Sequence, residues 1–174
     1  ITNSGDGFRE VFRNRIMFPI TDIRGRIVGF GGRQLSNNGP KYMNSPRTEV
    51  FDKSRILYGL EQAAPTIRNE GTAIIVEGYM DAITAHQFGS ATVVASMGTA
   101  ITQPQLDSLI NIASTVIFAL DADSAGQNAT LQKLSDALAS FQNLQTKSMV
   151  RSTKNSTIFA TPKKQMDFRV ISLP

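Results

Sequence analysis

Four carboxylates follow two short apolar runs of the sequence, either directly or within one helical turn. Glu77 and Asp81 come after the first run, and Asp121 and Asp123 come after the second. Four such groups gathered in one place would repel one another strongly unless a cation lay between them. Mg²⁺ suits that position, because it prefers oxygen ligands and also bridges the phosphates of substrates. The residue types and their spacing therefore predict a magnesium site that acts on a phosphate-bearing substrate.

The two apolar runs have the character of buried strands in a parallel sheet. Both are short and β-branched, and a segment with helical character follows each. Ligands of such sheets bind beyond the carboxyl ends of the strands, so Glu77 and Asp121 would reach the same edge. We therefore expect an α/β fold, with flanking helices, for residues 56–174. The expected strands are 73–77, 91–95, 116–120 and 168–173, and the expected helices are one from Ile56, which Pro65 would disturb, then 79–88, 103–113 and 124–140.

Each of these acids also has an ordinary structural explanation. An acid at the start of a helix often accepts a backbone hydrogen bond as an N-cap, which would account for Asp81 or Asp121 without chemistry. Two features favour the metal site instead. Glu77 and Asp121 end two strands of one expected sheet, and Asp123 adds another ligand at short spacing.

Residues 1–55 have a different sequence pattern, which predicts a small, mostly β subdomain. Apolar runs at 16–20 and 26–30 flank a turn at 22–25. The chain carries a net charge of +4, and basic residues gather in this part. A basic region accompanying an acidic metal site suits a nucleotide or nucleic-acid substrate, although a solvated basic surface explains the same composition. These basic residues are Arg9, Arg13, Arg15, Arg24, Arg26, Arg33, Lys41 and Arg47.

Glycines interrupt the second apolar run of this basic part. Gly29, Gly31 and Gly32 surround Phe30. Because glycine has no side chain, we expect the backbone there to bend or to approach a ligand closely.

The composition excludes several other kinds of site. The chain of 174 residues has no cysteine, so it contains no disulfide or thiolate zinc site, and its one histidine, His86, argues against a histidine-based metal site. Hydrophobic residues make up 41% of the chain, and no apolar run approaches the ~20 residues of a membrane span. The sequence opens on Ile1 without an initiator methionine, so we expect a fragment of a longer protein.

Several ordered motifs resemble a known family. The acids and their surroundings resemble the Toprim domain, which bacterial primases, topoisomerases and some nucleases share. Upstream motifs narrow the resemblance to the catalytic core of bacterial-type DNA primase, the DnaG family, over roughly residues 8–139 and the final strand. The Toprim-like segments are Glu77-Gly78-Tyr79-Met80-Asp81, Ala95-Ser96-Met97-Gly98-Thr99-Ala100 and Asp121-Ala122-Asp123-Ser124-Ala125-Gly126, and the upstream motifs are Arg15-Ile16-Met17-Phe18-Pro19-Ile20, Gly29-Phe30-Gly31-Gly32-Arg33, Pro40-Lys41-Tyr42-Met43-Asn44-Ser45-Pro46 and Leu57-Tyr58-Gly59-Leu60.

The resemblance implies a DNA primase, a nucleotidyltransferase of the DNA-directed RNA polymerase type that starts short RNA chains on a DNA template. It implies Mg²⁺ or Mn²⁺ as the cofactor and zinc only in an upstream domain absent from this chain. Glu77 matches the catalytic glutamate, which either assists deprotonation of the attacking hydroxyl or completes the metal's ligands. The implied metal ligands are Glu77, Asp81, Asp121 and Asp123, and the implied nucleotide- or template-binding residues are Arg15, Arg33 and Lys41.

The resemblance also implies partners and a location. The partners are single-stranded DNA, nucleoside triphosphates, the RNA primer and, through regions absent here, the replicative helicase; no membrane is expected. The location is the bacterial cytoplasm at the replisome, with an organelle as the alternative. The chain departs from the family in two ways. It stops at Pro174, before further acidic metal ligands of the family, and the polar stretch 140–165, a loop or insertion, is longer than usual.

Two other classes of protein stay open at this stage. One is a different Toprim enzyme, either a nuclease or a topoisomerase whose tyrosine nucleophile a missing domain could supply. The other is a non-catalytic Toprim scaffold that binds DNA or partner proteins. The primase-like upstream module argues against the first class, and the presence of all four acids argues against the second. Whether the fragment is active alone also stays open.

Overall fold

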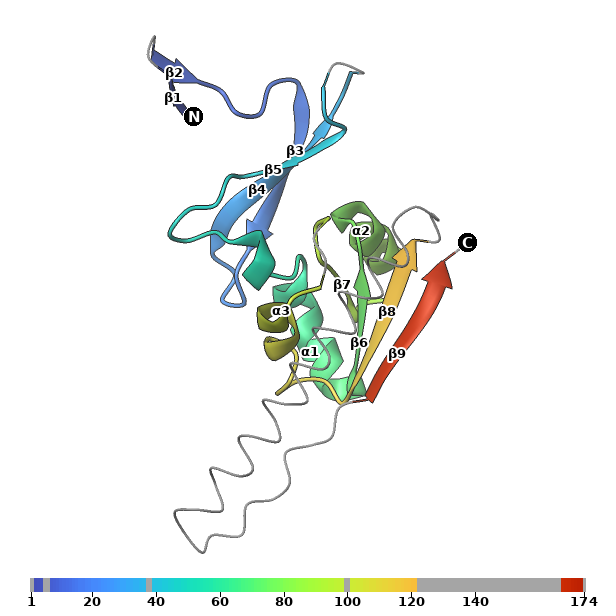
Figure 1. Ribbon diagram of the computed structural model, residues 1–174. Coiled ribbons are helices and arrows are strands. Elements are labelled where there is room, and N and C mark those ends of the chain that lie inside the picture. The colour runs from blue at the N-terminus through green and yellow to red at the C-terminus, as the bar shows by residue number, and fades with distance from the viewer. Residues whose placement is uncertain (1, 5–6, 37–38, 99–100, 122–166, 174) are drawn as a thin grey trace, which may run out of the picture. The chain divides into compact units, whose positions relative to one another are not determined.

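The computed structural model describes residues 2–4, 7–36, 39–98, 101–121 and 167–173, with side chains for 10–36, 39–98 and 101–119. The chain divides into two compact units, Ile1–Asp52 and Lys53–Pro174 (Figure 1). The first unit is antiparallel β structure, and the second is a parallel sheet with helices. The predicted α/β class with a preceding β subdomain is therefore confirmed. No helix among the described residues is long and apolar enough to cross a membrane.

The first unit contains two antiparallel sheets. A short hairpin precedes a three-stranded sheet of order β3-β4-β5. The predicted strands at 16–20 and 26–30 are confirmed and are longer than expected, whereas the hairpin and β5 were not predicted. The strands are β1 (Thr2–Ser4), β2 (Gly7–Arg9), β3 (Arg15–Thr21), β4 (Ile27–Gln34) and β5 (Tyr42–Asn44).

A side-chain network closes the turn between β3 and β4. The Asp22 carboxylate accepts hydrogen bonds from the backbone N–H groups of Arg24 and Arg26, at 2.9 and 3.0 Å. It also accepts one from the Arg26 guanidinium Nε at 2.7 Å. The Arg26 side-chain hydrogen bond is the largest cause that lowers the pKa of Asp22 from its ordinary value. Gly25, at φ 78°, takes the left-handed conformation that such a turn requires.

The second unit is a sheet of four parallel strands in the order β7-β6-β8-β9. The four predicted strands are confirmed, including the last, and Figure 1 shows the arrowheads of β8 and β9 at the same edge. The predicted helix 124–140 and the predicted loop 140–165 lie outside the described residues. The elements are α1 (Leu60–Glu70), β6 (Thr72–Val76), α2 (Tyr79–Gln87), β7 (Val93–Ala95), α3 (Gln103–Asp107), β8 (Thr115–Asp121) and β9 (Asp167–Leu173).

Helices cover both faces of this parallel sheet. Side chains of β6 alternate between two hydrophobic clusters: Ala73 and Ile75 belong to the cluster of α1 and α3, whereas Ile74 and Val76 belong to that of α2. Burial on both faces explains why the strands read as continuous apolar runs rather than as alternating ones. The rigid sheet between two packed layers fixes the positions of its strand ends.

The first helix differs from its prediction at both ends. It begins at Leu60 rather than at Ile56, because Tyr58 pairs instead with Ala95 on the outer edge of β7, through backbone hydrogen bonds of 2.8 and 3.0 Å. The helix also continues through Pro65 to Glu70. Pro65 is exposed, so the carbonyl that its ring leaves unbonded can meet water, while the opposite face of the helix packs in the core.

The predicted helix 103–113 is wrong in its second half, because α3 ends at Asp107 and tight turns follow. The Ser108 hydroxyl donates to the carbonyl of Gln105 at 2.6 Å and competes there with helical hydrogen bonding. Gln105 itself is fully buried, and its amide Nε2 donates to the carbonyls of Lys53 and Ile56 at 3.0 and 3.2 Å. This glutamine therefore ties the beginning of the second unit to α3.

Candidate functional site

The predicted acids lie at the carboxyl ends of two neighbouring parallel strands. Glu77 comes directly after β6, and Asp121 is the last residue of β8. The strands are in register from Thr72 opposite Thr115 to Ile75 opposite Phe118. Continued by two residues, this register brings Glu77 level with the residue before Asp121, and adjacent strands lie about 4.8 Å apart.

This strand pair is also the point where the order of the sheet reverses. From β6 the chain crosses to β7 on one side and then to β8 on the other. Open α/β sheets bind their ligands at such a switch point, beyond the carboxyl ends of the strands, because the two connections leave in opposite directions. The positions of Glu77 and Asp121 are therefore those at which this type of sheet builds a site.

The loop after β7 holds the backbone of Glu77. The Ser96 N–H donates to the carbonyl of Val76 at 3.0 Å, and the Gly98 N–H donates to the carbonyl of Glu77 at 3.1 Å. Met97 and Gly98 both have positive φ angles, 62° and 72°, which turn the chain back towards Glu77. A buried methionine in this conformation is uncommon, and such backbone outliers gather at functional sites.

Asp81 has the structural role that its position also allowed. Its carboxylate Oδ2 accepts a hydrogen bond from the Gly78 N–H at 3.1 Å and so caps α2. A Cβ atom at Gly78 would lie 2.8 Å from this oxygen, so glycine leaves the space that the cap needs. One carboxylate has two oxygens and several lone pairs, so this cap is compatible with a second ligand.

The acids match a divalent cation in chemistry. Mg²⁺ and Mn²⁺ take carboxylate oxygens, and the strand ends bring Glu77 beside Asp121. Side chains are described for Glu77 and Asp81, whereas Asp121 is described only as backbone and Asp123 lies outside the described residues. Within that described part, no group of three or more His, Cys, Asp or Glu side chains is arranged to hold a metal.

In the first unit, two of the predicted basic residues gather around one aromatic ring. Arg33 of β4 pairs with Tyr42 of β5, and Lys41 precedes Tyr42. The Arg33 guanidinium carbon lies 6.0 Å from the centroid of the Tyr42 ring, and the Lys41 Nζ lies 5.6 Å from it. Tyr42 was not among the expected site residues, but its ring attracts both cations and holds them near each other.

The third predicted basic residue lies on the opposite face of the same sheet. Arg15 pairs with Gln34, whereas Arg33 pairs with Ile16, and neighbouring residues of a strand point to opposite faces. Arg15 lines a concavity of about 480 Å³ that Arg13 also lines. Asn14, between them, has φ 53°, and its Nδ2 donates to the Ser36 hydroxyl at 3.1 Å. Arg13 was one of the basic residues noted in this part of the sequence but not one of the implied phosphate ligands; its spacing of two from Arg15 was the available signal.

The basic residues around Tyr42 and in the concavity form no ion pair with a carboxylate of the described part of the chain. These residues are Arg13, Arg15, Arg33 and Lys41. Among the same described residues, Arg26 and Arg47 do form ion pairs, with Asp22 and Asp52, at 2.6 and 3.2 Å. A phosphate would therefore displace none of the described carboxylates from these four side chains.

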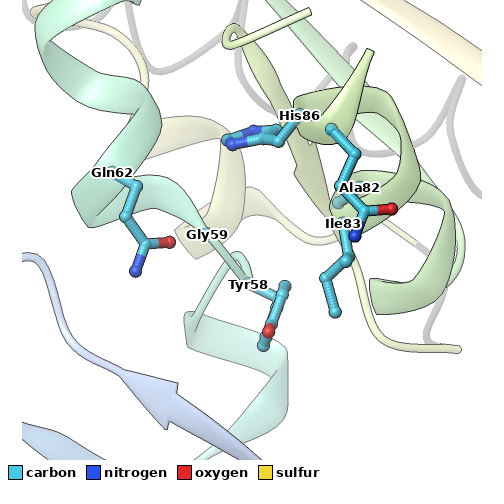
Figure 2. A pocket seen from close by; sticks show the side chains of 7 residues that line it. Tyr58, Gly59, Gln62, Ala82, Ile83 and His86 are labelled. Atoms are coloured by element: carbon cyan, nitrogen blue, oxygen red, sulfur yellow. The ribbon is translucent and has the colours of Figure 1, made fainter. Parts of the chain in front are cut away.

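A second concavity, of about 350 Å³, lies between the start of α1 and the helix α2 (Figure 2). His86 extends from α2 into this region and its Nε2 lies 2.7 Å from the carbonyl of Val93, so Nε2 carries the hydrogen and donates. Burial raises the pKa of the Tyr58 hydroxyl at the same pocket. The pocket contains none of the predicted site residues, and the His86 ring is bonded to the backbone there.

Comparisons with known proteins cover most of the chain. Residues 1–64 match the family described as "DNA primase catalytic core, N-terminal domain", and residues 74–157 match the family described as "Toprim-like". A DNA primase of Clostridium acetobutylicum is 52% identical over 121 residues, which cover 70% of this chain and 20% of the relative. The chain thus spans about a fifth of the length of that curated relative.

Solved structures agree with the sequence relatives. A structure of the DnaG catalytic core matches with a TM-score of 0.73 and 38% identity, over 95% of this chain and 46% of the other. A DnaG primase catalytic domain bound to single-stranded DNA matches with a TM-score of 0.68 and 44% identity, over 77% of this chain and 42% of the other. At 38% and 44% identity, the similarity to these structures extends to the amino-acid sequence as well as the fold.

Proposed function

This chain belongs to the family of bacterial-type DNA primases and contains part of their catalytic core, and we propose that it contributes to DNA-templated synthesis of short RNA primers. The observation that carries the proposal is the parallel register of β6 and β8, which brings Glu77 and Asp121 to one edge at the switch point of the sheet. The reaction joins nucleoside triphosphates by attack of a 3′-hydroxyl on an α-phosphorus, with pyrophosphate leaving.

Glu77 is the proposed catalytic residue. Its carboxylate either accepts the proton of the attacking hydroxyl or completes the ligand set of a divalent cation, together with Asp81, Asp121 and Asp123. When bound there, Mg²⁺ or Mn²⁺ supplies positive charge that stabilises the phosphates and lowers the pKa of the attacking hydroxyl. The hydrogen bond from Gly98 to the Glu77 carbonyl keeps the strand end in place, so the carboxylate needs little reorganisation during the reaction.

The basic residues of the first unit are the proposed phosphate ligands. Arg33 and Lys41, held beside the Tyr42 ring, and Arg15 on the other face bind the triphosphate or the template backbone. Charged donors of this kind form strong hydrogen bonds with phosphate oxygens. The proposed partners are single-stranded DNA, nucleoside triphosphates and the RNA primer, with the replicative helicase bound through other parts of the protein, in the bacterial cytoplasm.

The match of residues 1–64 to the primase catalytic core supports this function over the alternatives. A topoisomerase, a nuclease or a Toprim scaffold would share the acids at the edge of the parallel sheet. None of these alternatives explains why a β unit with basic residues precedes that sheet in the sequence.

Primer synthesis by the protein completed to the length of its relatives tests the proposal. On single-stranded DNA it should make short RNA only with a divalent metal, and chelation should stop synthesis. Glu77→Gln keeps the side-chain size and removes the charge, so synthesis should fall by about 10²-fold or more. Glu70→Gln, an exposed acid at the end of α1, is the matched control and should leave synthesis unchanged. Near-normal synthesis by a folded Glu77→Gln protein would contradict the catalytic role.

A further inference from the structure

At two glycines of β4, side chains of other residues occupy the space that a Cβ atom would take. Gly29 and Gly32 are both buried. A Cβ atom at Gly29 would lie 2.9 Å from the ring of Phe51, and one at Gly32 would lie 2.8 Å from the Phe12 ring and 3.0 Å from the Cδ of Arg15. Neither glycine needs the left-handed conformation, since both belong to a regular strand. Their missing side chains therefore make room for neighbours, and the sequence-based expectation of close approach by a ligand is not needed to explain them.

Gly32 differs from Gly29 in the residue that it accommodates. The stem of Arg15 passes over Gly32, and its Nη1 donates to the carbonyl of Gly32 at 3.2 Å. Both the aliphatic stem and the guanidinium of Arg15 therefore contact the backbone of Gly32. Arg15 is half-buried there, whereas Arg13 beside it in the concavity is exposed.

We propose that Gly32 is a positioning residue for phosphate binding, which holds the Arg15 guanidinium in the concavity through the space that it leaves and the carbonyl that it presents. The proposal rests on the proposed function for its ligand, a phosphate of single-stranded DNA. An arginine that is already ordered loses less side-chain freedom when it binds, so its contact is stronger than that of a mobile arginine. A side chain at position 32 would push the Arg15 stem away and turn its guanidinium out of the concavity.

The 174-residue chain with Gly32→Ala tests this role, and Gly29→Ala is its matched control. Both substitutions add one methyl group to the same strand against an aromatic ring, so both should lower the melting temperature by similar amounts. Only Gly32→Ala displaces an arginine. Binding of a fluorescent oligothymidylate is followed by anisotropy over a series of salt concentrations, at a temperature where all variants are folded.

We expect Arg15→Ala to weaken binding roughly tenfold and to reduce the salt slope by about 0.7, which is the loss of one phosphate contact with a single strand. Gly32→Ala should show most of both changes, and Gly29→Ala should show neither. The double variant Gly32→Ala with Arg15→Ala should bind no more weakly than Arg15→Ala alone, because Gly32 acts through Arg15. Additive losses in the double variant, or equal losses from both glycine variants, would overturn the proposal.

The arginine side chain itself gives a second result that needs no DNA. The Nε–H resonance of Arg15 should have a high ¹H–¹⁵N heteronuclear NOE in the wild type and in Gly29→Ala, and a low one in Gly32→Ala. An Arg15 that is equally mobile in all three proteins would overturn the positioning role. If Arg15 is ordered as expected but the wild type binds no oligothymidylate, the proposed template binding fails for this chain while the positioning role stands.

Discussion

The two units of the chain position their charged residues by different rules. In the parallel-sheet unit, Glu77 and Asp121 stand where strands end, and the topology alone sends them to one edge. In the β3–β5 sheet, Arg15 and Arg33 stand within strands, and the pleat separates them onto opposite faces. Residues at the carboxyl ends of parallel strands therefore lie at one edge of a sheet, whereas residues within strands lie on one face or the other according to their position.

This difference also decides what supports each charged group. The backbone of Glu77 is fixed by hydrogen bonds from the neighbouring loop, so its support comes from main-chain geometry. The basic residues depend instead on their neighbours: the Tyr42 ring beside Arg33 and Lys41, and the missing side chain of Gly32, whose place the Arg15 stem partly takes. We therefore expect substitutions of neutral neighbours to affect the basic residues more than the acidic edge.

The largest effect on stability should come from the buried glutamine of the second unit. Gln105→Ala removes a fully buried side chain and leaves the carbonyls of Lys53 and Ile56 without their donor, which costs about 1–3 kcal/mol of unfolding free energy. Gln103→Ala, in the same helix but with its amide Nε2 bonded to Asp107 at the surface, is the control and should cost less. Denaturant melts of both variants measure the difference. Equal losses of unfolding free energy in the two variants would show that the hydrogen bonds of Gln105 add nothing to the stability of the second unit.

A smaller effect should follow from removing the two cations beside Tyr42. Arg33→Ala with Lys41→Ala should weaken binding of oligothymidylate or nucleoside triphosphate roughly tenfold and flatten its salt dependence, because phosphate partners are lost. Anisotropy titrations at several salt concentrations measure this. Arg24→Ala with Arg68→Ala removes the same charge from exposed positions and serves as the control. Equal losses from both pairs would mean that general charge, rather than an arranged site, binds the phosphate.

The smallest effect should concern the turn before β4. The pKa of Asp22 is lowered in the folded protein, mainly by the Arg26 side-chain hydrogen bond, so ionised Asp22 stabilises the fold above its ordinary pKa of 3.8. That contribution is lost as the pH falls through the lowered value. Asp22→Asn should therefore melt slightly below the wild type at pH 7, and the gap should close below about pH 4. If the difference in melting temperature between the two proteins does not change with pH, the charge of Asp22 does not stabilise the turn.

The same contrast explains how much of the structure the sequence could predict. Short apolar runs predicted all four parallel strands, and the expected strand ends placed Glu77 and Asp121 at the carboxyl ends of neighbouring strands, because these positions depend on local pattern and topology. The sequence could not show that Arg15 and Arg33 face opposite ways, since that depends on a pairing register set by distant residues.

Two errors have a similar origin in contacts between distant residues. Tyr58 joins the edge of β7 instead of the first helix, and Pro65 is tolerated because one face of that helix packs in the core. The contacts of Gly29 and Gly32 with Phe51, Phe12 and Arg15 likewise join residues from different parts of the sequence, and no local pattern indicated them. Local propensity carries no information about such partners.

The central claim, that Glu77, Asp121 and Asp123 share one cation at a single sheet edge, is tested most directly by Mn²⁺ titration of this chain, followed by paramagnetic broadening of backbone amides. The amides of Gly78 and Asp121 should broaden first, while those of Thr72 and Thr115, which begin the same strands roughly 20 Å away, should broaden far less. Asp121→Asn with Asp123→Asn should remove the broadening at Gly78. Broadening that is unchanged in this double variant, or equal at both ends of the strands, would contradict the claim.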